Sequence, residues 1–314
     1  MINRIPLLKT DLQISALCLG GNVFGWSADE ATSKTILSDF YANGGNFVDT
    51  ADVYSEWKSG NTGGDSETII GNWMKESGNR DQMIIGTKVA MYSKRPGLSA
   101  ANIKLAVEDS LTRLQTDYLD LYYAHEDDEK TPLEETLGAF NELVISGKVK
   151  YIAASQYSGT RLSQALAVSQ ANGFASYVAI QNQYNILERE PFETDMKPVL
   201  ETNGMSAIPF FGLARGFLSG KYRAGVTVDS VRAGGVVDYQ NERGWKVIAA
   251  LGEIAKVHNS STAAVALAWL RAQKNVGVPI ASARTAEQLV ELMEIVELSP
   301  EELASIDVLS TPAS

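Results

Sequence analysis

Four side chains whose types suit acid catalysis stand at or just after the ends of apolar segments. Asp49, Lys88 and His125 each end an apolar, β-branched or aromatic run, and Tyr54 follows Asp49 in the next loop. Together they offer a carboxylate, an ammonium, an imidazole and a phenol, which can protonate and orient a carbonyl oxygen. These residue types therefore indicate proton transfer to a carbonyl group.

The spacing of these residues indicates which elements position them. Asp49, Lys88 and His125 lie roughly 40 residues apart, which suits one strand, one helix and two loops per unit. In a barrel of successive βα units, the C-terminal ends of the strands meet at one face, and the active sites of such barrels form there. The three runs therefore predict the catalytic face of a (β/α)8 barrel.

The rest of the chain continues this alternation of strands and helices. The runs predicted as strands are 17–20, 46–49, 83–88, 119–125, 151–155, 178–181, 206–210 and 276–281. Helical patterns lie at 31–41, 66–75, 100–114, 132–144, 158–169, 195–203, 245–258 and 286–296. Most of the strand runs are continuously apolar, as in parallel strands that are buried on both faces. The pattern predicts an α/β protein in which residues 1–314 form one barrel domain.

Three segments depart from this alternation. Residues 5–14 hold polar residues between apolar stretches and predict a short N-terminal β-hairpin. Residues 56–65 and 212–244 are rich in glycine and polar residues, and both follow predicted strands. Long loops in compact domains are usually functional or disordered. We expect these two loops to lie on the catalytic face and to shape the substrate end of the site.

The composition restricts the possible partners and compartment. The 314 residues are 45% hydrophobic and carry a formal net charge of −11, which argues against nucleic acid and anionic membrane as partners. No apolar stretch reaches the ~18 residues of a membrane span, and no signal peptide is recognisable. Cys18 is the single cysteine and lies in an apolar run, so we expect a buried thiol in a reducing compartment. The protein is therefore expected to be cytoplasmic.

Lys88 can act in two ways at the end of its strand. It can be a nucleophile that forms a Schiff base, as in an aldolase, or an electrostatic partner of a phenol acid. In the second interpretation, Asp49 holds the ammonium and the ammonium lowers the pKa of the Tyr54 phenol. Two distant histidines and one cysteine provide no metal-ligand set, so no metal site is expected.

The sequence around these residues resembles the aldo-keto reductase superfamily. The segments 47–54, 86–88 and 120–125 carry its catalytic motifs, and the resemblance extends from 17–25 to 216–222 in the late loop. It is similar in particular to the branch that contains bacterial reductases and potassium-channel β subunits. The resemblance implies a (β/α)8 barrel that reduces aldehydes and ketones with NADPH. It also implies that Asp49, Tyr54, Lys88 and His125 form the catalytic tetrad.

The resemblance also assigns residues to the cofactor, NADP(H). Ser155 and Gln181 fall where the family hydrogen-bonds the nicotinamide carboxamide, and Phe210 falls where an aromatic ring stacks on the nicotinamide. Lys221 and Arg232 fall where the family clamps the diphosphate. The further cofactor positions are Gly20, Gly21, Asn22, Gln156 and Leu213, and, in the segment that holds the 2′-phosphate and adenine, Ser282, Arg284, Gln288 and Glu291.

Some positions of the site differ from the family or concern the substrate. The family usually has Asn, Pro, Gly and Asn where this chain has Gln156, Gly212, Ser282 and Leu292. Trp26, Trp57 and Tyr92 follow the first three predicted strands and are candidates for a pocket that takes a small carbonyl substrate. The alternative function is a regulatory subunit that holds NADP(H) and reports the redox state to a partner with little turnover.

Overall fold

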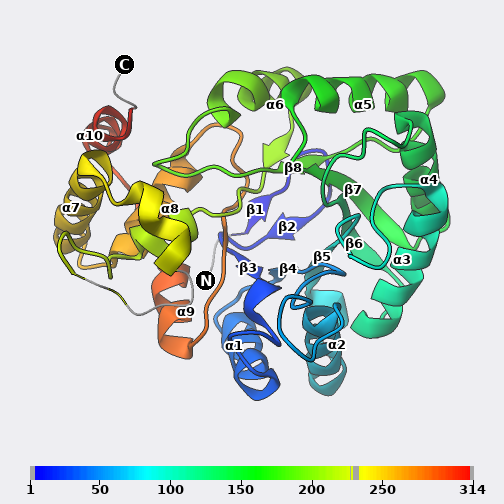
Figure 1. The fold of residues 1–314 in the computed structure, drawn as a ribbon, viewed down its shortest axis with the longest axis horizontal. Helices are drawn as coiled ribbons and strands as arrows, with labels where there is room; N and C mark the ends of the chain where they lie inside the picture. Colours follow the sequence, from blue (N-terminus) through cyan, green and yellow to red (C-terminus); the bar gives the residue numbers. More distant parts are fainter. Residues whose placement is uncertain (1–3, 227, 229–232, 312–314) are drawn as a thin grey trace.

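The computed structural model of the protein describes residues 4–226, 228 and 233–311. Its centre is a sheet of eight parallel strands in the order β10-β3-β4-β5-β6-β7-β8-β9, and helices surround it (Figure 1). The strands are β3 Cys18–Gly20, β4 Phe47–Asp49, β5 Ile84–Val89, β6 Leu119–Ala124, β7 Val149–Ser155, β8 Ala179–Gln181, β9 Ser206–Ala207 and β10 Ile280–Ala281. The helices are α1 Glu30–Ala42, α2 Asp65–Ser77, α3 Ala100–Leu114, α4 Leu133–Ile145, α5 Gly159–Asn172, α6 Lys197–Asn203, α7 Glu242–Val257, α8 Thr262–Ala272, α9 Ala286–Met293 and α10 Pro300–Ser310. This architecture confirms the predicted barrel.

The sheet closes where β9 meets the run that leads into β10. Ala207 of β9 forms a parallel bridge with Val276, and Ile280 of β10 donates its N–H to the carbonyl oxygen of Pro209 at 2.9 Å. Both strands are shorter than the predicted runs, because Pro209 and Pro279 have no N–H to donate to a ladder. The two runs nevertheless lie side by side, so the strand ends form a ring.

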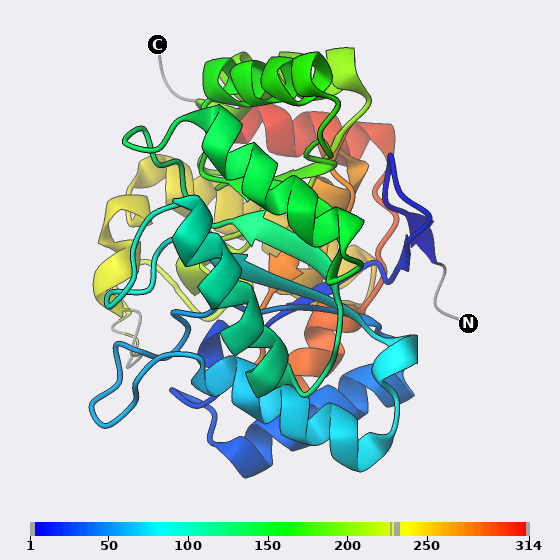
Figure 2. The ribbon, with the colours of Figure 1, turned by 90° about the vertical axis from the view of Figure 1, so that its right-hand side faces the viewer.

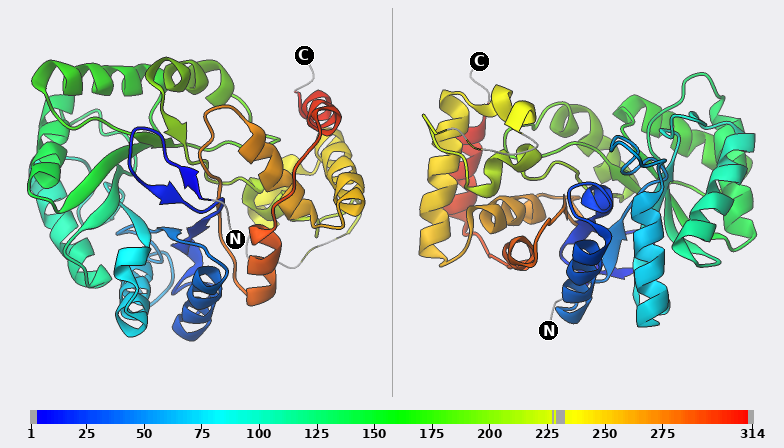
Figure 3. Two further views of the ribbon diagram at one scale, coloured as in Figure 1. Left: turned by 180° about the vertical axis from the view of Figure 1, so that it is seen from behind. Right: turned by 60° about the horizontal axis from the view of Figure 1, so that its bottom comes forward.

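The N-terminal hairpin covers one end of this ring (Figure 3, left). Its strands β1 Ile5–Pro6 and β2 Gln13–Ile14 pair antiparallel, as predicted. Leu7 and Leu12 belong to the same buried apolar cluster as Phe47 and Leu121, whose strands form the barrel wall. In Figure 2 the hairpin lies at one end of the barrel, and the long loops that follow the strands lie at the other. The face predicted to be catalytic is therefore the open end.

Several helical segments differ from the predicted set. The predicted ranges do not include α8, whose residues 263–270 are all buried and leave no polar face that would mark the helix ends. Helix α10 was also not predicted; a capping box between Ser299 and Glu302 begins it. The connection 212–244 is partly ordered as 3-10 helices, η4 Ala214–Ser219 and η5 Ala233–Tyr239. Among the described residues, no helix combines the length and the hydropathy that a membrane span requires.

Candidate active site

Neighbouring strands bring the carboxylate and the ammonium together. Asp49 ends β4, and Lys88 lies next to the last residue of β5. Their side chains are 3% and 0% exposed, and Lys88 Nζ donates a hydrogen bond to Asp49 Oδ2 at 2.7 Å. Nζ also donates to the carbonyl oxygen of Thr50 at 2.7 Å and to the Tyr54 hydroxyl at 2.8 Å. The ammonium therefore uses all three of its donors inside the site.

The Tyr54 hydroxyl lies between the two charged groups. It accepts from Lys88 Nζ and donates to Asp49 Oδ2 at 3.2 Å. A tight turn sends the chain back towards the strand end, because the N–H of Tyr54 donates to the carbonyl oxygen of Ala51 at 3.2 Å. Tyr54 also lines an open cleft. The phenol thus connects the buried ion pair to the cleft.

Burial decides the protonation state of this phenol. Burial, together with the negative charge of Asp49, raises the pKa of Tyr54 well above its usual value. The expectation of a lowered pKa for Tyr54 is wrong in its net direction, because burial and Asp49 raise that pKa. Burial also lowers the pKa of Lys88, against the opposing effect of Asp49. The phenol therefore keeps its proton at neutral pH, as a proton donor requires.

His125 follows β6 and completes the group. Its N–H donates to the carbonyl oxygen of Val89 at 2.9 Å, which fixes the residue at the end of β5. The imidazole meets the Tyr54 ring edge-on with centroids 5.9 Å apart, and its buried Nδ1 has no hydrogen-bond partner among the described residues. Burial, followed by the charge of Lys88, lowers the pKa of His125 well below its usual value. The imidazole is therefore neutral near pH 7 and can orient a polar group in the cleft.

A fifth residue supports Asp49. Gln181 ends β8, and its Nε2 donates to Asp49 Oδ1 at 2.8 Å, while Oδ2 accepts from Lys88 and Tyr54. Both carboxylate oxygens are therefore held. The resemblance assigns Gln181 to the cofactor only, because nothing in the local sequence connects it with a residue 132 positions away.

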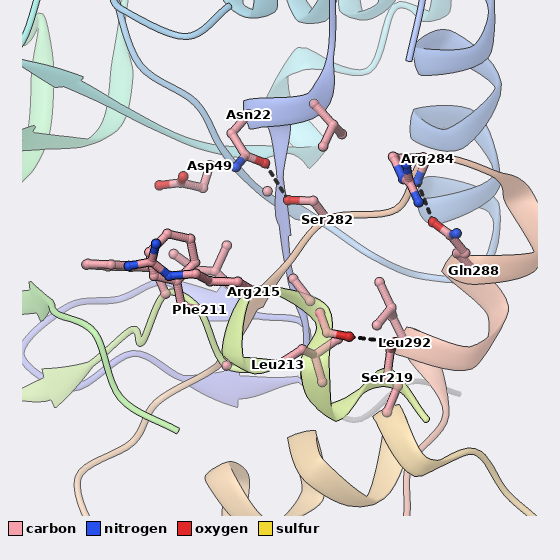
Figure 4. Close-up of a pocket in the computed structure, with 18 of the residues that line it drawn as sticks. Asn22, Asp49, Phe211, Leu213, Arg215, Ser219, Ser282, Arg284, Gln288 and Leu292 are labelled. Carbon is pink, nitrogen blue, oxygen red and sulfur yellow. Dashed lines mark hydrogen bonds between the residues drawn. The ribbon is translucent and has the colours of Figure 1, made fainter. Parts of the chain in front are cut away.

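A cleft of about 680 Å³ opens over these residues (Figure 4). The sequence-predicted residues that line it are Gly20, Asn22, Asp49, Tyr54, Trp57, His125, Ser155, Gln156, Gln181, Phe210, Leu213, Lys221, Ser282, Arg284, Gln288 and Glu291. Lys88 lies buried beneath it, and Gly21, Trp26 and Tyr92 are not among the described residues of its lining. Arg232 lies outside the described residues. The fold therefore gathers most of the predicted site into one cleft.

The cleft also contains residues that the sequence analysis did not single out. Phe211, Arg215 and Ser219 come from the segment after β9, and Met91 from the loop after β5. The Phe211 ring meets Phe210 edge-on at 5.1 Å, and the Arg215 guanidinium lies 4.7 Å from the centroid of the Phe211 ring. Their only signal in the sequence is their position in or beside a long loop at the catalytic face.

One end of the cleft is built by the ends of β3 and β10 and by the start of α9 (Figure 4). Ser282 Oγ donates to Asn22 Oδ1 at 2.7 Å, and the N–H of Arg284 donates to Gln288 Oε1 at 3.0 Å. A Cβ atom on Gly20 would lie 2.5 Å from Ser282 Oγ. Glycine at this position therefore leaves the space that the serine hydroxyl occupies.

Aromatic side chains gather around Tyr54. Trp57 is 50% exposed, lines the cleft and meets the Tyr54 ring edge-on at 6.1 Å. Trp26 meets Trp57 edge-on at 5.8 Å. Trp26 therefore supports the cleft wall through Trp57.

Comparisons with known proteins agree with this geometry. The model of the Aldo/keto reductase family matches residues 16–311. Norsolorinic acid reductase of Aspergillus flavus is 32% identical over 97% of this chain and 80% of its own length. The uncharacterized oxidoreductase YrpG of Bacillus subtilis is 34% identical over 93% of this chain and 90% of its own. A putative voltage-gated potassium channel subunit beta of Schizosaccharomyces pombe is 32% identical over 95% and 90%, respectively.

Proposed function

The chain belongs to the aldo/keto reductase family, and from that premise we propose that it reduces an aldehyde or ketone with hydride from NADPH and a proton from Tyr54. The family and the reductase names of the relatives indicate an oxidoreductase that acts on carbonyl compounds. One observation supports Tyr54 as the proton donor: its hydroxyl group is hydrogen-bonded to both Lys88 and Asp49 beside an open cleft.

In the proposed reaction, Tyr54 gives its proton to the carbonyl oxygen as the carbonyl carbon is reduced to an alcohol. Lys88 stabilises the phenolate that remains, because its ammonium already donates to that oxygen. Asp49 holds the ammonium in place. The neutral imidazole of His125 orients the carbonyl oxygen, and no covalent intermediate is needed.

The lining of the cleft suits a nicotinamide dinucleotide, and we propose NADPH. Lys221 and Arg284 offer positive charge to phosphates in a chain whose net charge is −11. Ser155 and Gln181 offer polar groups to the carboxamide, and Phe210 offers a ring for stacking. When bound, the cofactor supplies the hydride.

Consumption of NADPH by the purified protein tests the proposal directly. We expect steady turnover, followed at 340 nm, with some members of a panel of aliphatic and aromatic aldehydes and ketones. Because Trp57 is half-exposed beside Tyr54, aromatic carbonyl compounds should have the lowest KM. Absence of turnover with every member of the panel, while NADPH still binds, would reject the reductase.

That outcome would support a regulatory subunit, to which the name of the Schizosaccharomyces pombe relative points. The Schiff-base aldolase is less well supported, because Lys88 is fully buried and its three donors are taken. An aldolase would yield a borohydride-trapped adduct on Lys88.

The preference for NADPH over NADH should depend partly on Arg284. A charged hydrogen bond to the 2′-phosphate contributes roughly 1.5–3 kcal/mol, so Arg284→Ala should weaken NADPH binding about tenfold or more. NADH affinity should hardly change. Fluorescence titration with both cofactors measures the difference, with Arg4→Ala, an exposed arginine outside the cleft, as the matched control. Equal losses for both cofactors would show that Arg284 does not contact the 2′-phosphate.

A further inference from the structure

A buried carboxyl group lies between two members of the tetrad and is not used by the proposed reaction. Asp52 belongs to the turn that connects Asp49 with Tyr54. It is 2% exposed, and its Oδ1 is buried without a hydrogen-bond partner among the described residues. Its N–H donates to the carbonyl oxygen of Lys88 at 3.3 Å. Asp52 therefore ties the turn that carries Tyr54 to the strand that carries Lys88.

A buried polar cluster connects β5 with the helices α2 and α3, and the charges of this cluster act on the Asp52 carboxyl group. Glu67 of α2 is fully buried and accepts from Arg113 Nε of α3 at 2.6 Å and from Thr87 Oγ1 of β5 at 2.5 Å. Thr87 precedes Lys88 in β5, and its hydroxyl bonds to a helix outside the sheet, while Lys88 Nζ bonds to Asp49. Several titratable and charged groups change the pKa of Asp52 or have their own pKa changed by its charge. They are Glu67, Lys88, Arg95, Arg113 and Tyr122.

The cluster is balanced only when Asp52 is neutral. Glu67 and Arg113 form an ion pair, so ionised Asp52 adds an unmatched negative charge beside them. Burial, followed by the charge of Glu67, raises the pKa of Asp52 to about 7, although Arg113 opposes this. Once ionised, Asp52 favours the ammonium form of Lys88 and partly offsets the burial that lowers the pKa of that lysine.

We propose that Asp52 is a positioning residue for the carbonyl reduction: its main-chain N–H holds the turn that carries Tyr54 against β5, and its buried carboxyl group, once ionised, supports the charge of Lys88. This inference rests on the proposed function and adds to it a group that touches neither substrate nor cofactor. It predicts that Asp52 influences the upper pH limit of the reaction, because the ammonium of Lys88 is needed for proton transfer from Tyr54.

The pH profile of Asp52→Asn tests this inference. The asparagine amide keeps the shape of the neutral acid but cannot supply the charge, so the decline of kcat at alkaline pH should begin roughly half a pH unit or more earlier. KM should change little, because the side chain lies outside the cleft lining. Asp81→Asn is the matched control, because Asp81 is exposed and precedes the other end of β5. A superimposable profile for Asp52→Asn would overturn the inference, as would a uniform loss of kcat with no shift.

Folding of the variant is controlled separately. Asp52→Ser also removes the carboxylate and keeps a small polar group, so it carries the same test if Asp52→Asn does not fold. If neither variant folds while Asp81→Asn does, Asp52 acts on the fold itself, and the assignment as a positioning residue is wrong.

A double-mutant cycle gives a measurement that does not depend on turnover. Thermal unfolding of Asp52→Asn, Lys88→Met and the double variant at pH 8.5 should show that the two substitutions are not additive, since ionised Asp52 attracts Lys88. The non-additivity should shrink at pH 5.5, where Asp52 is neutral. Coupling without turnover in the wild type would reject the proposed function alone; turnover with additive effects at both pH values would reject the role of Asp52 alone.

Discussion

Replacement of Tyr54 by phenylalanine is expected to abolish most carbonyl reduction while NADPH affinity stays nearly unchanged. The loss in kcat should be about 10²–10⁴-fold, the usual contribution of a positioned general acid. The activity is lost because the Tyr54 hydroxyl, which lies in the cleft and is hydrogen-bonded to both Lys88 and Asp49, is the proposed proton donor. Phenylalanine keeps the ring beside Trp57 and removes only this hydroxyl.

Steady-state kinetics and a fluorescence titration with NADPH measure the two parts of this prediction. Tyr92→Phe is the matched control, because it removes a phenol from a nearby loop residue that is not among the described lining of the cleft. If Tyr54→Phe retained more than a few per cent of wild-type kcat, Tyr54 could not be the proton donor.

Lys88→Met is expected to be nearly as damaging to catalysis and more damaging to stability. The phenolate that forms during proton transfer would lose its charged neighbour, so kcat should fall by about 10²-fold or more. The Asp49 carboxylate would remain buried without its cation. Breaking a buried ion pair in this way costs roughly 3–5 kcal/mol.

A second substitution tests whether the loss of stability comes from the unpaired Asp49 carboxylate. The double variant Asp49→Asn/Lys88→Met should regain part of the stability without regaining activity, since it removes the unpaired charge. Chemical denaturation of the single and double variants measures this. Wild-type kcat and pH profile in Lys88→Met would show that Lys88 is structural and that the tetrad is wrongly assigned.

The sequence alone was sufficient to predict the barrel and the contact between its strand ends. Apolar runs that end on Asp49, Lys88 and His125 at a regular spacing predict parallel strands. In a barrel of parallel strands, the C-terminal ends of all strands lie at one face. The contact between Lys88 and Asp49 at 2.7 Å follows from this rule. The rule holds without side-chain detail, because it depends only on the periodicity of burial and the direction of the chain.

Tertiary structure decided which groups outside these runs touch the site and which protonation states they adopt. Gln181 reaches Asp49 only because β8 and β4 face each other across the barrel. The charges of Glu67 and Arg113 act on Asp52 only because α2 and α3 cover the outside of the neighbouring strands. The sequence-based expectation for the pKa of Tyr54 had the wrong sign, because it counted the nearby charge and not the burial. Burial depends on every segment that packs around a group, so no local stretch of sequence contains it.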